Sequence, residues 1–133
     1  MVGRGSRVGR SKFSNSGRNR QGNEAIFVLE RAFPNQPARA GAVANDIAWR
    51  VAGSGGDLDA ALPLAKLVVG RLPARPEPYD TLGTIYLKSG EVRQAVAAFE
   101  KSLSIVPGDA TYRTHLTEAR SARTAARTSE GAR

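Results

Sequence analysis

From residue 24 to about residue 122, apolar residues recur at intervals of three and four, which is the spacing of amphipathic helices. Alternation of apolar and polar residues, the pattern of a half-buried strand, is absent, and alanine is abundant. Residues that end helices interrupt the pattern at positions 34, 53–57, 73–78, 89–90 and 107–108. The chain is therefore predicted to be all-α, with helices near residues 24–33, 40–52, 58–71, 76–89, 91–105 and 110–122.

Residues at the predicted helix ends support these boundaries. Asn23 is a suitable N-cap for the first helix, and Asp57 and Asp109 for the third and the sixth. Pro76 lies in the first turn of the fourth helix, where its missing N–H is harmless. Gly90 follows that helix and can adopt the left-handed conformation that ends it. Pro63, inside the third helix, should remove one backbone hydrogen bond or bend the helix slightly.

The fourth and fifth predicted helices carry a recognisable spacing of residues. Tyr79-x2-Leu82-Gly83-x2-Tyr86 is followed by Ala95-x3-Phe99 and then by Pro107. This pattern resembles the tetratricopeptide repeat, a helical hairpin of 34 residues. Pro73 precedes Pro107 by the expected period, and Ser102 departs from the family, which usually has a small apolar residue there.

A weaker copy of the pattern precedes this repeat. Ile47-Ala48 takes the place of the Leu-Gly pair, Val51 that of the tyrosine, and Ala61-x3-Ala65 that of Ala-x3-Phe. Further back, Ala25-x3-Leu29-x2-Ala32, followed by Pro37, matches only the second helix of a repeat. The resemblance thus covers about residues 24–122.

The resemblance implies a right-handed α-solenoid of antiparallel helix pairs, with about two and a half repeats and a capping helix. The alternative is a generic helix bundle in which the spacing arises by chance. In the solenoid, Gly83 and Ala95 allow two helix backbones to approach closely, which explains a glycine inside a helix. Residues 23–126 would form the repeat domain, and residues 1–22 and 127–133 would be disordered arms.

Members of this family use the first helices of successive repeats to line a concave groove that holds a peptide or a partner helix. The resemblance places eight candidate binding residues in such a groove: Asn45, Asp46, Trp49, Asp80, Thr81, Thr84, Leu87 and Lys88. Trp49 is the only tryptophan, and it could instead pack against the neighbouring repeat. Because the lysines and asparagines that grip a C-terminal carboxylate in one variety of the family are mostly missing, we expect no binding of that kind.

The net charge of +8 is concentrated at the two ends of the chain. Residues 1–24 carry a net charge of +5 and residues 113–133 carry +3, whereas residues 25–112 are neutral overall. Scattered arginines among Gly, Ser and Asn resemble basic segments that bind RNA phosphates. Arg113, Arg120 and Arg127 form a basic line on the sixth helix, which is either a contact for phosphate or the polar outer face of a cap.

Composition argues against an enzyme or a metal site. The chain has no cysteine and one histidine, His115, which has no evident nucleophile or metal partner and is expected at the surface or edge. We therefore expect no catalytic residues, no metal and no cofactor. Nothing approaches a membrane span, and no apolar segment typical of a secretory signal is present. The basic N-terminus resembles a mitochondrial transit peptide only faintly, so we expect a cytoplasmic protein.

The incomplete first repeat predicts an exposed end. The helix at residues 24–33 lacks its first-helix partner, which should leave Ile26, Phe27 and Leu29 partly uncovered. Repeat arrays generally need about three units to bury a continuous core, so we expect self-association through this end or marginal stability. The leading hypothesis is a non-catalytic adaptor that binds another protein or peptide in its groove. The alternative is a nucleic-acid-associated protein that uses its basic arms on phosphates.

Overall fold

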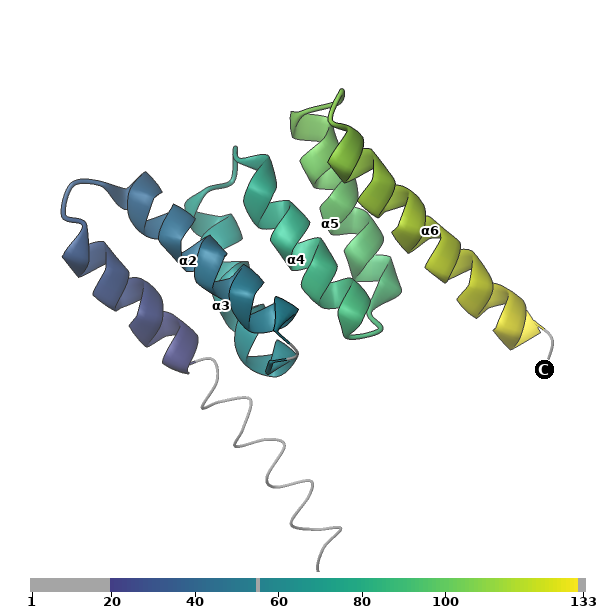
Figure 1. Ribbon diagram of the computed structural model, residues 1–133, viewed down its shortest axis with the longest axis horizontal. Coiled ribbons are helices and arrows are strands. Elements are labelled where there is room, and N and C mark those ends of the chain that lie inside the picture. Colours follow the sequence, from purple (N-terminus) through teal and green to yellow (C-terminus); the bar gives the residue numbers. More distant parts are fainter. Residues whose placement is uncertain (1–19, 55, 132–133) are drawn as a thin grey trace, which may run out of the picture.

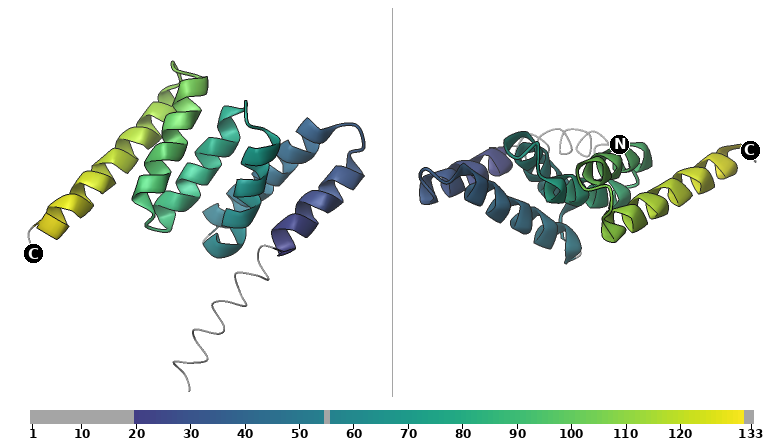
Figure 2. Two further views of the ribbon diagram at one scale, coloured as in Figure 1. Left: turned by 180° about the vertical axis from the view of Figure 1, so that it is seen from behind. Right: turned by 90° about the horizontal axis from the view of Figure 1, so that it is seen from above.

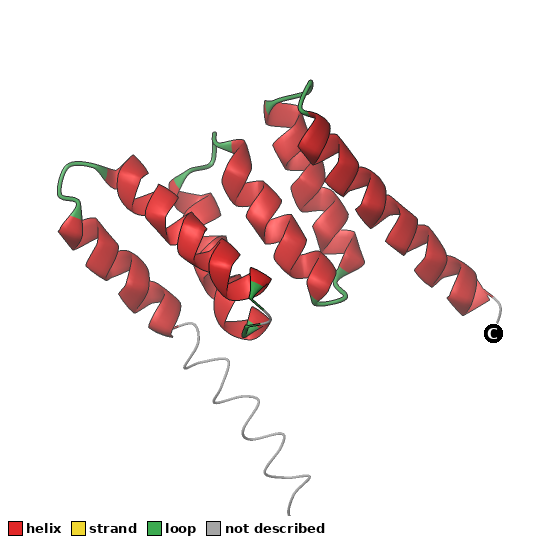
Figure 3. Ribbon diagram, in the orientation of Figure 1, coloured by secondary structure: helices red, strands yellow, loops and turns green. Residues whose placement is uncertain are grey.

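The computed structural model describes residues 20–54 and 56–131, and this part of the chain contains six helices and no strand (Figures 1 and 3). A helix at residues 20–32 comes first. It is followed by α2 (Pro37–Gly53), α3 (Leu58–Arg71), α4 (Pro76–Lys88), α5 (Val92–Ile105) and α6 (Ala110–Gly131). The predicted all-α class is confirmed. Residues 1–19 of the predicted N-terminal arm lie outside the described residues.

Most of the predicted helix ends have the expected chemistry. The Asp57 side chain accepts a hydrogen bond of 3.2 Å from the backbone N–H of Ala60, and Asp109 accepts one of 3.0 Å from that of Tyr112. A proline occupies the first turn of both α2 and α4. Gly90 ends the α4–α5 turn with a φ of +81°, a conformation that favours glycine. These local signals therefore fix where the central helices begin and end.

Three predicted boundaries were wrong. The first helix already includes residue 20, so Asn23 lies inside it and is not its N-cap. Gly22 is buried, and its Cα faces the backbone of Leu64 and the side chain of Pro63 in α3, so tertiary packing holds this turn helical. Helix α2 begins at Pro37 rather than at residue 40. Helix α6 continues to Gly131, well beyond its predicted end at residue 122.

Consecutive helices run antiparallel and stack side by side in a row (Figure 1). The helix at residues 20–32 lies at one end of the row and α6 at the other. Each of α2 to α5 packs against the next helix in the chain, and α4 also contacts both α2 and α6. Helices α2, α4 and α6, which run in the same direction, are therefore neighbours across the row.

Two hydrophobic clusters hold the row together. The first joins the helix at residues 20–32 to α2, α3 and α4, and its buried members are Ile26, Ala44, Ala48, Ala52, Ala61, Leu64, Ala65, Val68 and Ile85. The second joins α5 to α6, and its members are Ala95, Val96, Phe99, Leu116 and Ala119. The many alanines let the helix backbones approach closely, so each helix pair buries its apolar stripe against the next.

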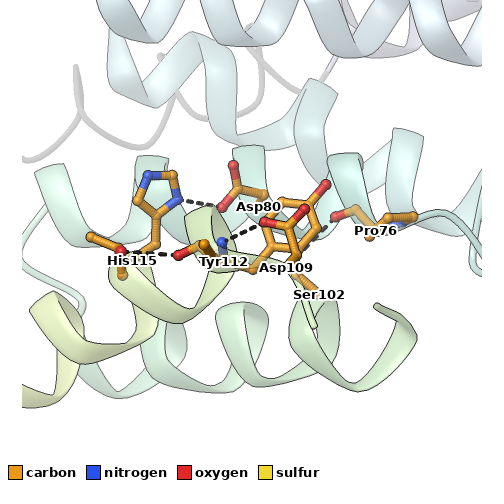
Figure 4. Close-up of polar contacts among 8 residues, drawn as sticks. Pro76, Asp80, Ser102, Asp109, Tyr112 and His115 are labelled. Carbon is orange, nitrogen blue, oxygen red and sulfur yellow. Dashed lines mark hydrogen bonds and ion pairs between the residues drawn. The ribbon is translucent and has the colours of Figure 1, made fainter. Parts of the chain in front are cut away.

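Ser102 is fully buried in α5 although its side chain is polar. Its hydroxyl donates a hydrogen bond of 3.0 Å to the carbonyl oxygen of Pro76, in the first turn of α4 (Figure 4). This bond ties α5 to the start of the neighbouring helix. It also gives a physical reason for a serine where the sequence resemblance predicted a small apolar residue.

Candidate binding face

Helices α2, α4 and α6 form one side of the row, here named the α2/α4/α6 face (Figure 2). Ala42, Asn45 and Trp49 recur at i, i+3 and i+7, so they share one side of α2. Ala42 and Asn45 lie against the first turn of α4. Trp49, one turn further along the same side of α2, therefore belongs to the same face.

Trp49 is 44% exposed, so much of its indole is available for contact with another molecule. Tryptophan on a surface offers a large apolar area and one N–H donor, which is why it is frequent at the centres of protein interfaces. The predicted alternative, in which Trp49 packs into the neighbouring repeat, would require a buried side chain. Trp49 is thus only partly covered, and its place in a groove stays a prediction.

Asn45, one turn before Trp49, has an unusual polar environment. Its Oδ1 atom is enclosed, yet among the described residues it accepts no hydrogen bond. A buried acceptor without a partner costs about 1–3 kcal/mol in free energy of unfolding. Because Oδ1 has no contact with solvent, a donor from outside the chain reaches it only when the Asn45 side chain rotates toward the cleft between α2 and α4.

Asn45 lines a small cleft between α2 and the start of α4, with a volume of about 110 Å³. Its other lining residues are Ala42, Leu72, Arg75, Glu77 and Pro78. Arg75 and Glu77 form a loose ion pair of 3.9 Å at this cleft, and both are half-exposed. The cleft therefore offers both hydrogen-bond donors and acceptors beside an apolar wall, which suits a short polar group flanked by apolar atoms.

Of the six residues that line the cleft, only Asn45 is among the eight predicted binding residues. Leu72, Arg75 and Pro78 belong to the proline-rich connection between α3 and α4 and to the first turn of α4. The prediction considered only positions on helices, whereas the connection folds against α2. One feature of the sequence could have identified this connection. The 34-residue period between Pro73 and Pro107 marks it as part of the repeat.

On α4, the predicted binding residue Thr81 is buried, and a second one, Asp80, already contacts a residue of the fold. Thr81 is only 3% exposed, so its side chain belongs to the interior and does not line the face. Asp80 is also largely covered, with a side chain 14% exposed, and its Oδ1 lies 2.6 Å from Nδ1 of His115 in α6 (Figure 4). This contact joins two neighbouring helices of the face.

His115, which the sequence analysis expected at the surface or edge, is partly exposed and has two partners inside the fold. Its side chain is 26% exposed, and its ring centre lies 5.5 Å from that of Phe99. Burial raises the pKa of Asp80 above its ordinary value, although the hydrogen bond and the charge of His115 act in the opposite direction, and Asp109 adds to the increase. The pair therefore places a titratable contact between α4 and α6.

The other predicted binding residues differ in whether contacts within the fold already occupy their side chains. The Asp46 carboxylate is 2.9 Å from Nε of Arg50 on the same helix, and Nζ of Lys88 donates a 3.4 Å hydrogen bond to the carbonyl oxygen of Ala52. Lys88 thereby links the ends of α4 and α2. Thr84 and Leu87 are partly exposed on α4. Contact with a partner would thus depend mainly on Asn45, Trp49, Thr84 and Leu87.

The predicted basic line on α6 is partly occupied by contacts within the fold. Arg120 pairs with Glu100 of α5 at 3.1 Å, and Arg113 donates to the carbonyl oxygen of Pro107 at 3.3 Å. Arg127 is exposed near the end of α6. Two of the three arginines therefore have a structural role that does not require phosphate.

Comparison of the chain with protein-family models and with curated proteins finds no match. Within residues 20–54 and 56–131, no helix is both long and apolar enough to cross a membrane. The same residues contain no group of three histidine, aspartate or glutamate side chains that could hold a metal ion.

Proposed function

We propose that this chain is a non-catalytic protein-interaction module, built as a short right-handed α-solenoid of the tetratricopeptide type. In this proposal the α2/α4/α6 face is concave and binds an extended peptide or a partner helix. The observation that carries the proposal is the pairing of exposed Trp49 with the unpartnered Oδ1 of Asn45, one helical turn away on the same side of α2.

The chemistry of these two residues defines the partner. An apolar or aromatic side chain of the partner packs against Trp49 and Leu87. The Asn45 side chain rotates toward the cleft that it lines and accepts a hydrogen bond from a backbone or side-chain N–H of the partner. Because Asp80 and Lys88 are already engaged by His115 and by the carbonyl of Ala52, charge contributes little to recognition at these positions. Binding through this face is therefore expected to persist at high salt, unlike binding of arginines to phosphates.

Selection of peptides from a displayed random library on the immobilised full chain tests the proposal. The selected peptides should bind the wild-type chain and lose at least tenfold in affinity to the Trp49→Ala variant, because a tryptophan at the centre of an interface typically carries about 2 kcal/mol or more of binding energy. Val106→Ala is the matched control, since Val106 is also an exposed apolar residue but lies in the turn between α5 and α6.

Two results would count against the proposal. Peptides that bind Trp49→Ala as well as the wild type would place the binding site elsewhere. Capture of partners that disappears after nuclease treatment, or after deletion of residues 1–19, would instead favour the basic arms as the functional element.

A further inference from the structure

The helix at residues 20–32 has one buried side and one apolar exposed side. Gly22 and Ile26 are buried against the neighbouring helices, so the prediction that Ile26 is uncovered was wrong. Phe27 and Val28, on the outer side, are 59% and 62% exposed. Two adjacent apolar side chains on an outer helix face leave a considerable apolar area in contact with water.

The opposite end of the row has a different character. Helix α6 carries no large exposed apolar side chain among its described residues. Its outer surface presents arginines, threonines and small alanines, which is suitable for a face that stays in water. The two ends of the row are therefore not equivalent, and only the end formed by the helix at residues 20–32 presents an apolar face.

Charged residues flank the apolar pair symmetrically. Glu24 precedes Phe27 by three residues and Arg31 follows Val28 by three. The midpoint between the two charged residues is therefore also the midpoint between the two apolar ones. All four residues are exposed. Within the described part of the chain, neither Glu24 nor Arg31 forms an ion pair, whereas neighbouring Glu30 is paired with Arg71 of α3 at 3.3 Å. The Arg31 guanidinium lies 5.7 Å from the ring centre of Phe27, which keeps it beside the apolar pair.

We propose that this face, formed by Glu24, Phe27, Val28 and Arg31, binds the same face of a second copy of the chain in an antiparallel, two-fold symmetric dimer. When two such helices cross antiparallel at their common midpoint, Phe27 of each copy meets Val28 of the other. Glu24 of each copy then lies opposite Arg31 of the other, which gives two complementary charge pairs. A parallel arrangement would instead place Glu24 against Glu24 and Arg31 against Arg31, so the charge pattern selects the antiparallel dimer.

The size of the face indicates a reversible dimer. A stable interface usually buries about 1,600 Å² in total, and one side of a single short helix provides less than that. Dimerisation should therefore depend on protein concentration. It uses none of the residues of the α2/α4/α6 face, so the two binding events are independent and can be tested separately.

Sedimentation equilibrium of the full chain, with charge-reversal variants, tests this dimer. Glu24→Arg and Arg31→Glu should each weaken self-association about tenfold, because each change turns both charge pairs of the dimer into repulsive ones. An equimolar mixture of the two variants should associate like the wild type, since the arginine introduced at position 24 of one chain then meets the glutamate introduced at position 31 of the other. Phe27→Asp should abolish association.

Glu118→Arg is the matched control, because it makes the same charge change at an exposed position on α6, at the other end of the row. It should leave self-association unchanged. A wild-type chain that stays monomeric at all concentrations would overturn the proposal, as would a dimer that Glu24→Arg and Arg31→Glu do not weaken. Failure of the mixed variants to associate would exclude the antiparallel arrangement.

Discussion

Gly83 of α4 lies directly against the ring of Phe99 of α5. A Cβ atom built at Gly83 would come within 2.6 to 2.9 Å of three ring carbons, closer than real atoms approach. Since Phe99 is almost completely buried, its ring has no free space into which it can move. The absence of a side chain at residue 83 is therefore what allows α4 and α5 to pack around this ring.

Gly83→Ala should lower the free energy of unfolding. Alanine favours the helix by about 1 kcal/mol, but overpacking a core typically costs about 1–3 kcal/mol, so we expect a net loss of up to about 2 kcal/mol. Urea unfolding followed by circular dichroism measures it. Gly70→Ala is the control, because no atom lies within 4 Å of a Cβ placed there, and it should stabilise the protein by about 0.5 kcal/mol. Equal effects at the two positions would show that the Phe99 contact is unimportant.

Ser102→Ala should destabilise the protein by about 1 kcal/mol. The substitution keeps the small side chain in the core but removes the hydrogen bond to the carbonyl oxygen of Pro76. Ser104→Ala provides the comparison, since Ser104 is exposed and its hydroxyl bonds only to Lys101 of the same helix. Thermal unfolding should show a lower midpoint for the first variant and an unchanged midpoint for the second. A midpoint for Ser102→Ala equal to that of the wild type would mean that the bond adds no stability.

The Asp80 carboxyl should make stability depend on pH. Because burial raises the pKa of Asp80 in the folded protein, the folded chain holds the proton of this group more tightly than the unfolded chain. The stability contributed by the protonated form is fully present below the pKa of the unfolded chain, near 4. It is lost as the pH rises through the folded pKa.

Asp80→Asn removes this ionisation, so it isolates the effect. As the pH rises through this window, the free energy of unfolding of the variant should increase relative to that of the wild type. Urea unfolding of both chains at several pH values measures the difference, in which the other titrating groups largely cancel. A difference that stays constant, or that falls as the pH rises, would contradict the assigned effect of burial.

The helix ends show how much the sequence alone could establish. Asp57, Pro76 and Gly90 act through their own backbone or side chain within one turn, so their roles were predictable from local sequence. Gly22 was not, because glycine disfavours helices locally and only its packing against Pro63 and Leu64 explains the helix there. Helix ends were thus predicted correctly where residues within one turn determine them, and wrongly where packing against a distant segment determines them.

The candidate binding face shows the same division. Helical spacing placed Asn45 and Trp49 on one side of a helix, and both lie in α2 in the structure. The contact of Asp80 with His115 joins residues 35 positions apart, and it depends on the side-by-side placement of α4 and α6. The burial of Thr81 likewise depends on how far α4 is rotated toward the core. Neither relationship follows from helical periodicity alone.

The most direct test of the proposed function uses Trp49, the only tryptophan, as its own reporter. A peptide selected on the wild-type chain and free of tryptophan is titrated into the protein while tryptophan fluorescence is recorded, at low and at high salt. We predict a saturable shift of the emission to shorter wavelength, as the partner covers the indole, with similar affinity at both salt concentrations. Binding established by calorimetry that leaves the emission unchanged, or that disappears at high salt, would contradict recognition through the α2/α4/α6 face.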